Sequence, residues 1–243
     1  MTRCSFVLMT RDRANFLPGA FAQLREQKGK DDEVVVTGYL PDDATYLGVK
    51  DNKAIVDKLL HVRADSGAEA VNAAKGLLEG EYVRIVSDDD YTYADQMEHA
   101  IQVMARSTDI DLLVCGGVKK DVPSGKTSLV CLPKGTSYAT SPKDILQWGA
   151  CGTGFLFRRN VLDKVQFDTS VIADMTFAID CINAGLTVKF CRIKMFRHPI
   201  YQHSNIHAKR NEMEKALRKL YIQYSFVLEP LVKNAPAWDG SLT

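Results

Sequence analysis

The chain has 243 residues, of which 46% are hydrophobic and 25% are charged, and its formal net charge is +1. This length predicts one large globular domain, or a domain with an appendage, and a sizeable core. The balanced charge gives no electrostatic footprint of a nucleic-acid binder, so we expect no nucleic-acid partner. The six Cys form no CxxC pair and mostly lie in apolar runs. We therefore expect buried free thiols in a reducing cytosol.

The apolar run near the N-terminus is too short for a signal peptide, and no window is long and apolar enough to span a bilayer. The first hundred residues alternate β-prone runs with helix-compatible segments. We expect strands over 4–10, 33–37, 55–62 and 82–86, a loop over 38–46, and helices over 16–27, 66–78 and 95–106. This alternation is typical of an α/β domain with a mostly parallel sheet.

The second half continues with further strands and helices and a Gly-rich run. We expect strands over 111–118, 155–157 and 187–193, a hairpin or flap over the site in 119–140, and helical segments over 141–148, 160–165, 175–184 and 208–233. Residues 149–154 contain three Gly, so the backbone there should approach another group closely. They are not a GxGxxG run that opens a helix, which argues against a dinucleotide site.

Three consecutive carboxylates, Asp88 to Asp90, follow the expected strand 82–86 after the single residue Ser87. Adjacent carboxylates repel one another, and burying them without a partner is costly. Mg²⁺ and Mn²⁺ prefer carboxylate oxygens, and the carboxyl ends of strands in an open α/β sheet are where ligands bind. The alternative is a solvated turn that caps the next helix.

Taken in chain order, several segments resemble the family-2 glycosyltransferases of the GT-A fold. The family's opening T-Y-N-R-x-x-x-L is similar to Thr10-Arg11-Asp12-Arg13-Ala14 followed by Phe16-Leu17-Pro18. Its metal stretch G-E-Y-I … D-x-D-D is similar to Gly80-Glu81-Tyr82-Val83 followed by Asp88-Asp89-Asp90. Phe167-Asp168, Asp174 and the helix stop at Gly185 resemble the segment that carries the base, and His203-Ser204-Asn205 resembles the late His of the metal site.

The resemblance covers residues 4–207 and implies an α/β fold of the GT-A type, with a mixed, mostly parallel sheet flanked by helices. We expect residues 1–207 to form this domain, with a nucleotide-sugar half over about 1–118 and an acceptor half over about 119–207. Residues 208–243 would form a C-terminal helical extension and tail.

The resemblance also implies a metal-dependent, inverting transfer of a sugar from a nucleotide-sugar. Asp89 is the first expected ligand of Mn²⁺ or Mg²⁺, with Asp88 or Asp90 helping, and His203 would complete the shell. His198 is the rival of His203. Asp174 would be the general base, although Asp at a helix N-cap is common.

Residues of the donor site are expected in the first loop, in the loop after the second strand and in the triplet: Thr10, Arg11, Asp12, Arg13, Tyr39 and Asp88. Trp148 and Gly149 would form an acceptor platform, with a core Trp as the alternative. The acidic pair that normally reads the base is replaced by Thr37-Gly38, so Tyr39, Asp42 or Asp43 would take over, with UDP as the expected nucleotide. Ser87 and Ala173 also stand where the family has acidic residues.

The implied acceptor is a hydroxyl of a glycan or lipid-linked molecule, as in bacterial-type surface polysaccharide synthesis. We expect a cytoplasmic protein, with peripheral membrane contact as an alternative. The basic C-terminal stretch would pack on its own domain, form a homodimer or touch a membrane surface. Two other functions stay open: a catalytically silent binding module, favoured by Ser87 and Ala173, and a nucleotidyltransferase. The latter needs a Gly-rich phosphate loop, which residues 10–15 do not supply.

Overall fold

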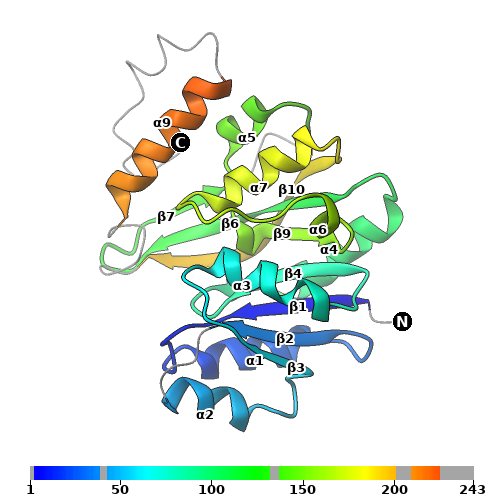
Figure 1. Ribbon diagram of the computed structural model, residues 1–243, viewed down its shortest axis with the longest axis vertical. Helices are drawn as coiled ribbons and strands as arrows, with labels where there is room; N and C mark the ends of the chain where they lie inside the picture. Colours follow the sequence, from blue (N-terminus) through cyan, green and yellow to red (C-terminus); the bar gives the residue numbers. More distant parts are fainter. Residues whose placement is uncertain (1–2, 39–42, 132–136, 201–208, 225–243) are drawn as a thin grey trace.

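The computed structural model of residues 1–243 describes residues 3–38, 43–131, 137–200 and 209–224 (Figure 1). Within these residues one sheet of ten strands has the order β3-β2-β1-β4-β9-β6-β10-β5, with β7 paired to β6 and β8 to β10. The strands are β1 (Cys4–Met9), β2 (Glu33–Gly38), β3 (Lys58–His61), β4 (Tyr82–Ser87), β5 (Tyr91–Thr92), β6 (Leu112–Asp121), β7 (Thr127–Val130), β8 (Ser137–Ala139), β9 (Phe155–Arg158) and β10 (Val188–Ile200).

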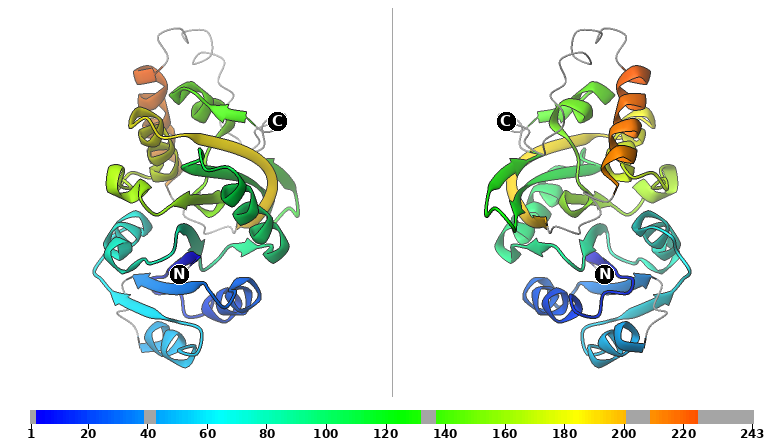
Figure 2. Two further views of the ribbon diagram at one scale, coloured as in Figure 1. Left: turned by 90° about the vertical axis from the view of Figure 1, so that its right-hand side faces the viewer. Right: turned by 90° about the vertical axis from the view of Figure 1, so that its left-hand side faces the viewer.

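Helices cover both faces of this sheet. They are α1 (Leu17–Gln27), α2 (Asp43–Asp51), α3 (Gly67–Ala74), α4 (Ala94–Arg106), α5 (Pro142–Trp148), α6 (Val161–Lys164), α7 (Ala173–Asn183) and α9 (Arg210–Tyr224), with short 3₁₀ turns η1 (Lys75–Leu77) and η2 (Gly152–Gly154). Figure 2 shows α1 and α3 on opposite sides of the N-terminal strands. The expected mixed α/β sheet flanked by helices is confirmed. Among the described residues, however, five of its nine strand pairings are antiparallel.

The strand directions bring several loops to one edge of the sheet. β1 is parallel to β2 and β4, and β2 is parallel to β3. β9 is antiparallel to both β4 and β6, so β6 and its parallel partner β10 again run in the direction of β4. The carboxyl ends of β1 and β4 therefore lie together, because Met9 pairs with Ser87.

The core lies on both faces of the sheet because successive strand side chains point to opposite sides. On β1, Val7 joins the cluster that contains α3, α5 and α7, whereas Phe6 and Leu8 join the one that contains α1 and α4. All six Cys are free thiols and five of them are buried, as expected.

Several predicted boundaries are wrong. The strand expected over 55–62 spans only Lys58–His61, and the helix expected over 66–78 ends at Ala74 and is followed by η1. Residues 38–46 do not form only a loop, since α2 begins at Asp43. The last strand does not end at Ile193 but continues to Ile200, past irregularities at Cys191–Lys194 and Lys194–Phe196, because it keeps pairing with β6. The hairpin expected in 119–140 is present as the antiparallel pair β6–β7.

The C-terminal helix α9 packs on the rest of the chain. Its Leu220 is buried in the core, Tyr221 donates a hydrogen bond of 3.0 Å to the carbonyl of Leu146, and Tyr224 accepts one of 3.3 Å from Asn183. Intramolecular packing is thus its observed role in the described residues. No helix in the described part of the chain has the length and apolar character needed to cross a membrane.

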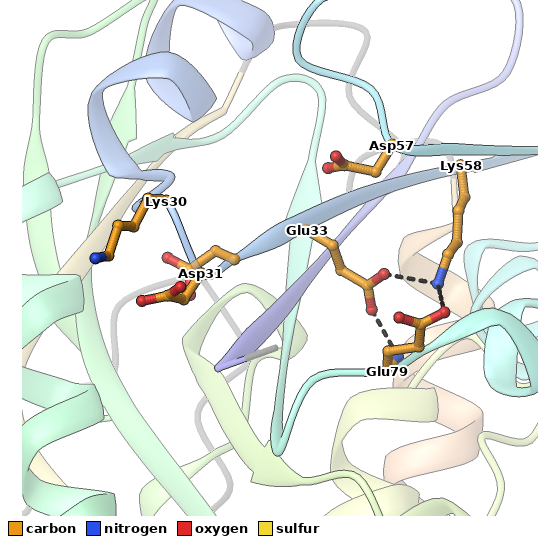
Figure 3. Close-up of a pocket in the computed structure, with 7 residues that line it drawn as sticks. Lys30, Asp31, Glu33, Asp57, Lys58 and Glu79 are labelled. Carbon is orange, nitrogen blue, oxygen red and sulfur yellow. Dashed lines mark hydrogen bonds and ion pairs between the residues drawn. The ribbon is translucent and has the colours of Figure 1, made fainter. Parts of the chain in front are cut away.

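At the opposite edge of the sheet, charged side chains line a hollow at the amino ends of β2 and β3 (Figure 3). Lys58 Nζ lies 2.8 Å from Glu33 Oε2 and 2.6 Å from Glu79 Oε1. Glu33 also accepts hydrogen bonds from the Ser5 hydroxyl at 2.5 Å and the Glu79 N–H at 2.6 Å. Burial opposes ionisation, but the bonds from Lys58 and Ser5 hold the pKa of Glu33 below its ordinary value of 4.5. Glu33, Lys58 and Glu79 are thus paired with one another, so we assign this group of charges to stability.

Glu33→Gln should lower the free energy of unfolding at pH 7 by about 1–3 kcal/mol, because it weakens hydrogen bonds to a buried charged group. A depressed pKa in the folded state stabilises above the unfolded pKa and is lost as the pH falls through the folded value. The difference from wild type should therefore shrink below pH 4.5. Urea unfolding at several pH values measures this difference, with Glu26→Gln, an exposed position outside the cluster, as the control. A difference that does not depend on pH would contradict this assignment.

Candidate functional site

The acidic triplet lies in the turn between β4 and β5, and the loop after β1 faces it. β5 pairs antiparallel with β10, where Thr92 lies opposite Phe196. Gln23 on α1 fastens this turn, since its side-chain amide donates to the Asp90 carbonyl at 3.1 Å and accepts from the Thr92 N–H at 2.7 Å. The triplet is therefore a firmly held turn at the carboxyl edge of the sheet.

Asp88 is buried and is bound by the first loop. Its Oδ2 accepts from the Thr10 hydroxyl at 2.9 Å, and its Oδ1 accepts from Arg13 Nη1 at 2.8 Å. Burial raises the pKa of Asp88, against the opposing effect of Arg13 and Thr10. The structure thus brings together Thr10, Arg13 and Asp88, three of the expected donor-binding residues.

Asp89 is the more open neighbour, with 20% of its side chain exposed against 2% for Asp88. Arg13 Nη1 lies 2.6 Å from its Oδ2, and the Ser87 hydroxyl donates to its Oδ1 at 2.5 Å. Ser87, which replaces an acidic residue of the family pattern, therefore orients Asp89. The accessible carboxylate is the one that the sequence favours as the first metal ligand.

Asp90 points to a different part of the site. Its Oδ2 accepts from the Thr153 hydroxyl, and its Oδ1 faces His198 Nδ1. Burial works against a charged imidazole, but the hydrogen bond with Asp90 outweighs it and raises the pKa of His198. Both Asp90 oxygens are thus engaged within the protein, and its side chain is 3% exposed, against 20% for Asp89.

Asp174 lies in the first turn of α7, but it is not the cap. The N-cap is Ile172, which makes no side-chain capping bond. The carboxylate instead lies against the Gly-rich run: a Cβ on Gly152 would be 2.8 Å from Asp174 Oδ1. This is the close backbone approach expected for residues 149–154. Burial raises the pKa of Asp174, the Gly152 backbone hydrogen bond and His198 lower it, and Asp90 raises it.

A buried arginine that the sequence did not single out lies behind the turn. Arg84 on β4 is fully buried, donates to the carbonyl of Ile85 at 2.5 Å and to the Thr92 hydroxyl at 3.2 Å, and its Nε has no partner among the described residues. Burial lowers the pKa of Arg84 to about 10, and the field of Asp90 is among the effects that oppose this. A strand position gives no sign of such burial. The sequence likewise did not reveal the contacts of Gln23 on α1 and Thr153 in η2, because both depend on long-range packing.

Other expected site residues lie elsewhere. Arg11 points its Nη1 at the carbonyls of Ala64 and Asp65, 3.4 Å from each, and Asp12 takes a positive φ of 51°. Trp148 packs edge-on against Phe190, with ring centroids 5.1 Å apart, which favours the core alternative. Gly149 ends α5 with a φ of 74°. Tyr39, Asp42 and His203 lie outside the described residues.

Among the described residues no three His, Cys, Asp or Glu side chains form a group that could hold a metal ion by themselves. Asp88 and Asp89 nevertheless each direct one oxygen at a single cationic nitrogen, Arg13 Nη1. Hard carboxylate oxygens that share one cationic partner suit Mg²⁺ or Mn²⁺, which commonly keep waters and substrate phosphates as their other ligands.

No protein-family model matches this sequence, and no curated protein matches it. Solved structures do match it. The mannosyltransferase PcManGT from Pyrobaculum calidifontis, in complex with GDP-Man and Mn²⁺, has a TM-score of 0.68 at 16% identity, over 91% of this chain and 63% of that one. S. aureus TarS 1–349, in complex with UDP-GlcNAc, has a TM-score of 0.71 at 15% identity, over 92% of this chain and 67% of that one.

The chain has the GT-A fold. The same TarS fragment with UDP matches at a TM-score of 0.66 and 14% identity, over 91% of this chain and 65% of that one. This chain therefore spans about two thirds of the length of each of these structures. At such identities the likeness establishes the fold, and the chemistry must be argued from the residues themselves.

Asp174→Asn should become more stable relative to wild type as the pH rises. A carboxyl with a raised pKa in the folded state favours folding at low pH, and this contribution is lost as the pH rises through the folded pKa. Urea unfolding of both proteins between pH 4 and pH 8 measures the difference. Exposed Asp163→Asn, which pairs with Lys75 on the surface, is the control. An equal difference at every pH would show that burial does not perturb Asp174.

Proposed function

We propose that this chain is a metal-dependent, inverting glycosyltransferase that transfers a sugar from a nucleotide-sugar to a hydroxyl group. One observation carries the proposal. On a GT-A fold, one edge of the sheet collects the Asp88–Asp89 pair with Arg13 and, beyond Asp90, a separate buried carboxylate at Asp174. The first group suits a diphosphate with its cation, and the second suits proton removal.

The donor side consists of Thr10, Arg13, Asp88 and Asp89. Asp88 and Asp89 would hold Mn²⁺ or Mg²⁺, which when bound supplies charge stabilisation to the departing diphosphate. Arg13 is the described cation nearest these carboxylates, and a guanidinium suits phosphate oxygens. PcManGT is crystallised with GDP-Man and Mn²⁺ and TarS with UDP-GlcNAc, which supports a sugar nucleotide as the donor. We propose a UDP-sugar.

Asp174 would accept the proton of the attacking hydroxyl as it approaches the face opposite the diphosphate. The burial that raises its pKa makes the carboxylate a stronger base, while Gly152 and His198 keep its ionised form accessible. Gly152 lets the backbone lie directly against the carboxylate, because a Cβ there would come within 2.8 Å of Asp174 Oδ1 and push it away. The resemblance of residues 167–185 to the base-carrying segment of family-2 glycosyltransferases supports inversion with Asp174 as the base.

The acceptor is proposed to be a glycan or lipid-linked molecule of a surface polysaccharide pathway, used on the cytoplasmic side of a membrane. The described residues of α9 and its start carry exposed cations, which would favour an anionic membrane surface. They are Lys209, Arg210, Lys215, Arg218 and Lys219. Ile222, of which 72% is exposed, would add an apolar contact.

A catalytically silent module is the second candidate, because Ser87 and Ala173 lack the usual carboxylates. The hydrogen bond from Ser87 to Asp89 weighs against it, since the replacement still orients the expected ligand.

Calorimetric titration of UDP with and without Mn²⁺ tests the donor site. We expect wild type to bind UDP only with Mn²⁺. Asp89→Asn should weaken binding more than 10-fold, because even outer-shell partners of a metal contribute about 10–100-fold to its affinity. Asp163→Asn is the charge-matched control. Tight binding of UDP by Asp89→Asn would refute the metal site, and binding of another nucleotide in place of UDP would correct the base.

Asp174→Asn should lower the rate of UDP release from a UDP-sugar by about 10²–10⁴-fold, the contribution of a general base, and leave UDP affinity unchanged. Gly152→Ala should also slow the reaction, because its methyl group displaces the carboxylate, whereas Gly19→Ala has open space around it and should not. Unimpaired turnover by Asp174→Asn would remove its role as base.

A further inference from the structure

One guanidinium nitrogen is shared by two carboxylates. Arg13 Nη1 lies 2.8 Å from Asp88 Oδ1 and 2.6 Å from Asp89 Oδ2. A single atom that close to two anionic oxygens occupies the place where a cation between them is most stabilised. A divalent ion that uses the same two oxygens cannot bind while Nη1 is there.

The other oxygens of both carboxylates are fixed independently of Arg13. The Thr10 hydroxyl holds Asp88 Oδ2 at 2.9 Å, and the Ser87 hydroxyl holds Asp89 Oδ1 at 2.5 Å. Removing the guanidinium would therefore leave both remaining oxygens directed at the vacated position. Two converging carboxylates with no cation between them repel each other, so their affinity for another cation increases.

Arg13 has a route out of this position. It belongs to the loop after β1, 32% of its side chain is exposed, and its guanidinium lies 5.8 Å from the centre of the Phe16 ring. A diphosphate beside the two carboxylates would offer this side chain new anionic oxygens. Movement of Arg13 onto the diphosphate would open the position to a divalent ion.

We propose that Arg13 competes with the divalent cation for Asp88 Oδ1 and Asp89 Oδ2, so that cation uptake depends on the donor's diphosphate. The proposal rests on the proposed function, since it needs a diphosphate ligand at this edge. Its consequence is reciprocal: UDP strengthens Mn²⁺ binding by the factor by which Mn²⁺ strengthens UDP binding. In wild type, Mn²⁺ alone binds weakly.

The test is Mn²⁺ binding without nucleotide, followed by electron paramagnetic resonance of the free ion, on wild type, Arg13→Gln and Arg11→Gln. Arg13→Gln should bind Mn²⁺ about 10-fold more tightly than wild type, within the usual 5–150-fold range of coupling between sites. Arg11→Gln removes the same charge from the same loop but not from the triplet, so it should match wild type. Arg13→Lys, which restores a cation, should return the affinity toward the wild-type value.

Two further measurements complete the design. Asp89→Asn in the Arg13→Gln background should abolish the gain, which locates the ion between the two carboxylates. In wild type UDP should strengthen Mn²⁺ binding strongly, and in Arg13→Gln this coupling should fall by at least the 10-fold gain. Thermal unfolding of each variant verifies that it is folded.

Unchanged or weaker Mn²⁺ binding by Arg13→Gln would overturn the inference, as would an equal gain in Arg11→Gln, which would indicate a general charge effect. If wild type still binds UDP only with Mn²⁺ in those cases, the proposed function stands without the competition. If no protein binds Mn²⁺ or UDP under any condition, the proposed function fails together with the inference.

Discussion

The pairing of β1 with β4 is the constraint on which the site depends. Its parallel register places Met9 beside Ser87, so the residues that follow each strand leave the sheet at the same point. Thr10 and Arg13 then reach Asp88 and Asp89 across about 75 residues of sequence. A shift of one residue would turn the buried side chains of β1 to the opposite faces, so packing of Phe6, Val7 and Leu8 fixes the register.

The three adjacent carboxylates can lie side by side because they are directed at different partners. Asp88 and Asp89 share Arg13 on the outer side, whereas Asp90 turns inward to His198 and Thr153. Arg84 adds a buried positive charge behind the turn and bonds to Thr92. Desolvation of a carboxylate is costly unless it is paired, and each member of the triplet has such pairing.

Under the proposed function the same division separates two chemical tasks. The outer pair would meet the diphosphate and its cation, while the inner Asp90–His198 pair lies electrostatically close to Asp174, whose pKa both groups influence. The Gly-rich run touches both the triplet and Asp174. Thr153 donates a hydrogen bond to Asp90, and Gly152 lies against the Asp174 carboxylate. Chain segments from β4, β10, η2 and α7 thus meet at one edge of the sheet.

The sequence by itself determined the fold class and the positions of the short motifs, because both follow from the local pattern of residues. Alternating apolar runs predicted the α/β sheet, the order of short motifs indicated the GT-A fold, and the acidic triplet was correctly placed after a strand. The three Gly in residues 149–154 predicted a close backbone approach, which Gly152 makes to Asp174. These features depend on neighbours in the sequence, where periodicity and residue type carry the information.

Only the tertiary structure decided how distant groups are paired. Arg11 and Arg13 lie two residues apart in the same loop, so the sequence alone does not tell which of them faces the triplet. The path of the loop in the folded chain decides this. His198 became the partner of Asp90 because β10 continues to Ile200 through pairing with β6, which a pattern ending at Ile193 does not reveal. The burial of Arg84 and the core packing of Trp148 likewise follow from long-range contacts. Such contacts are set by the register and curvature of the whole sheet. These cannot be predicted from the local residue pattern of a single sequence.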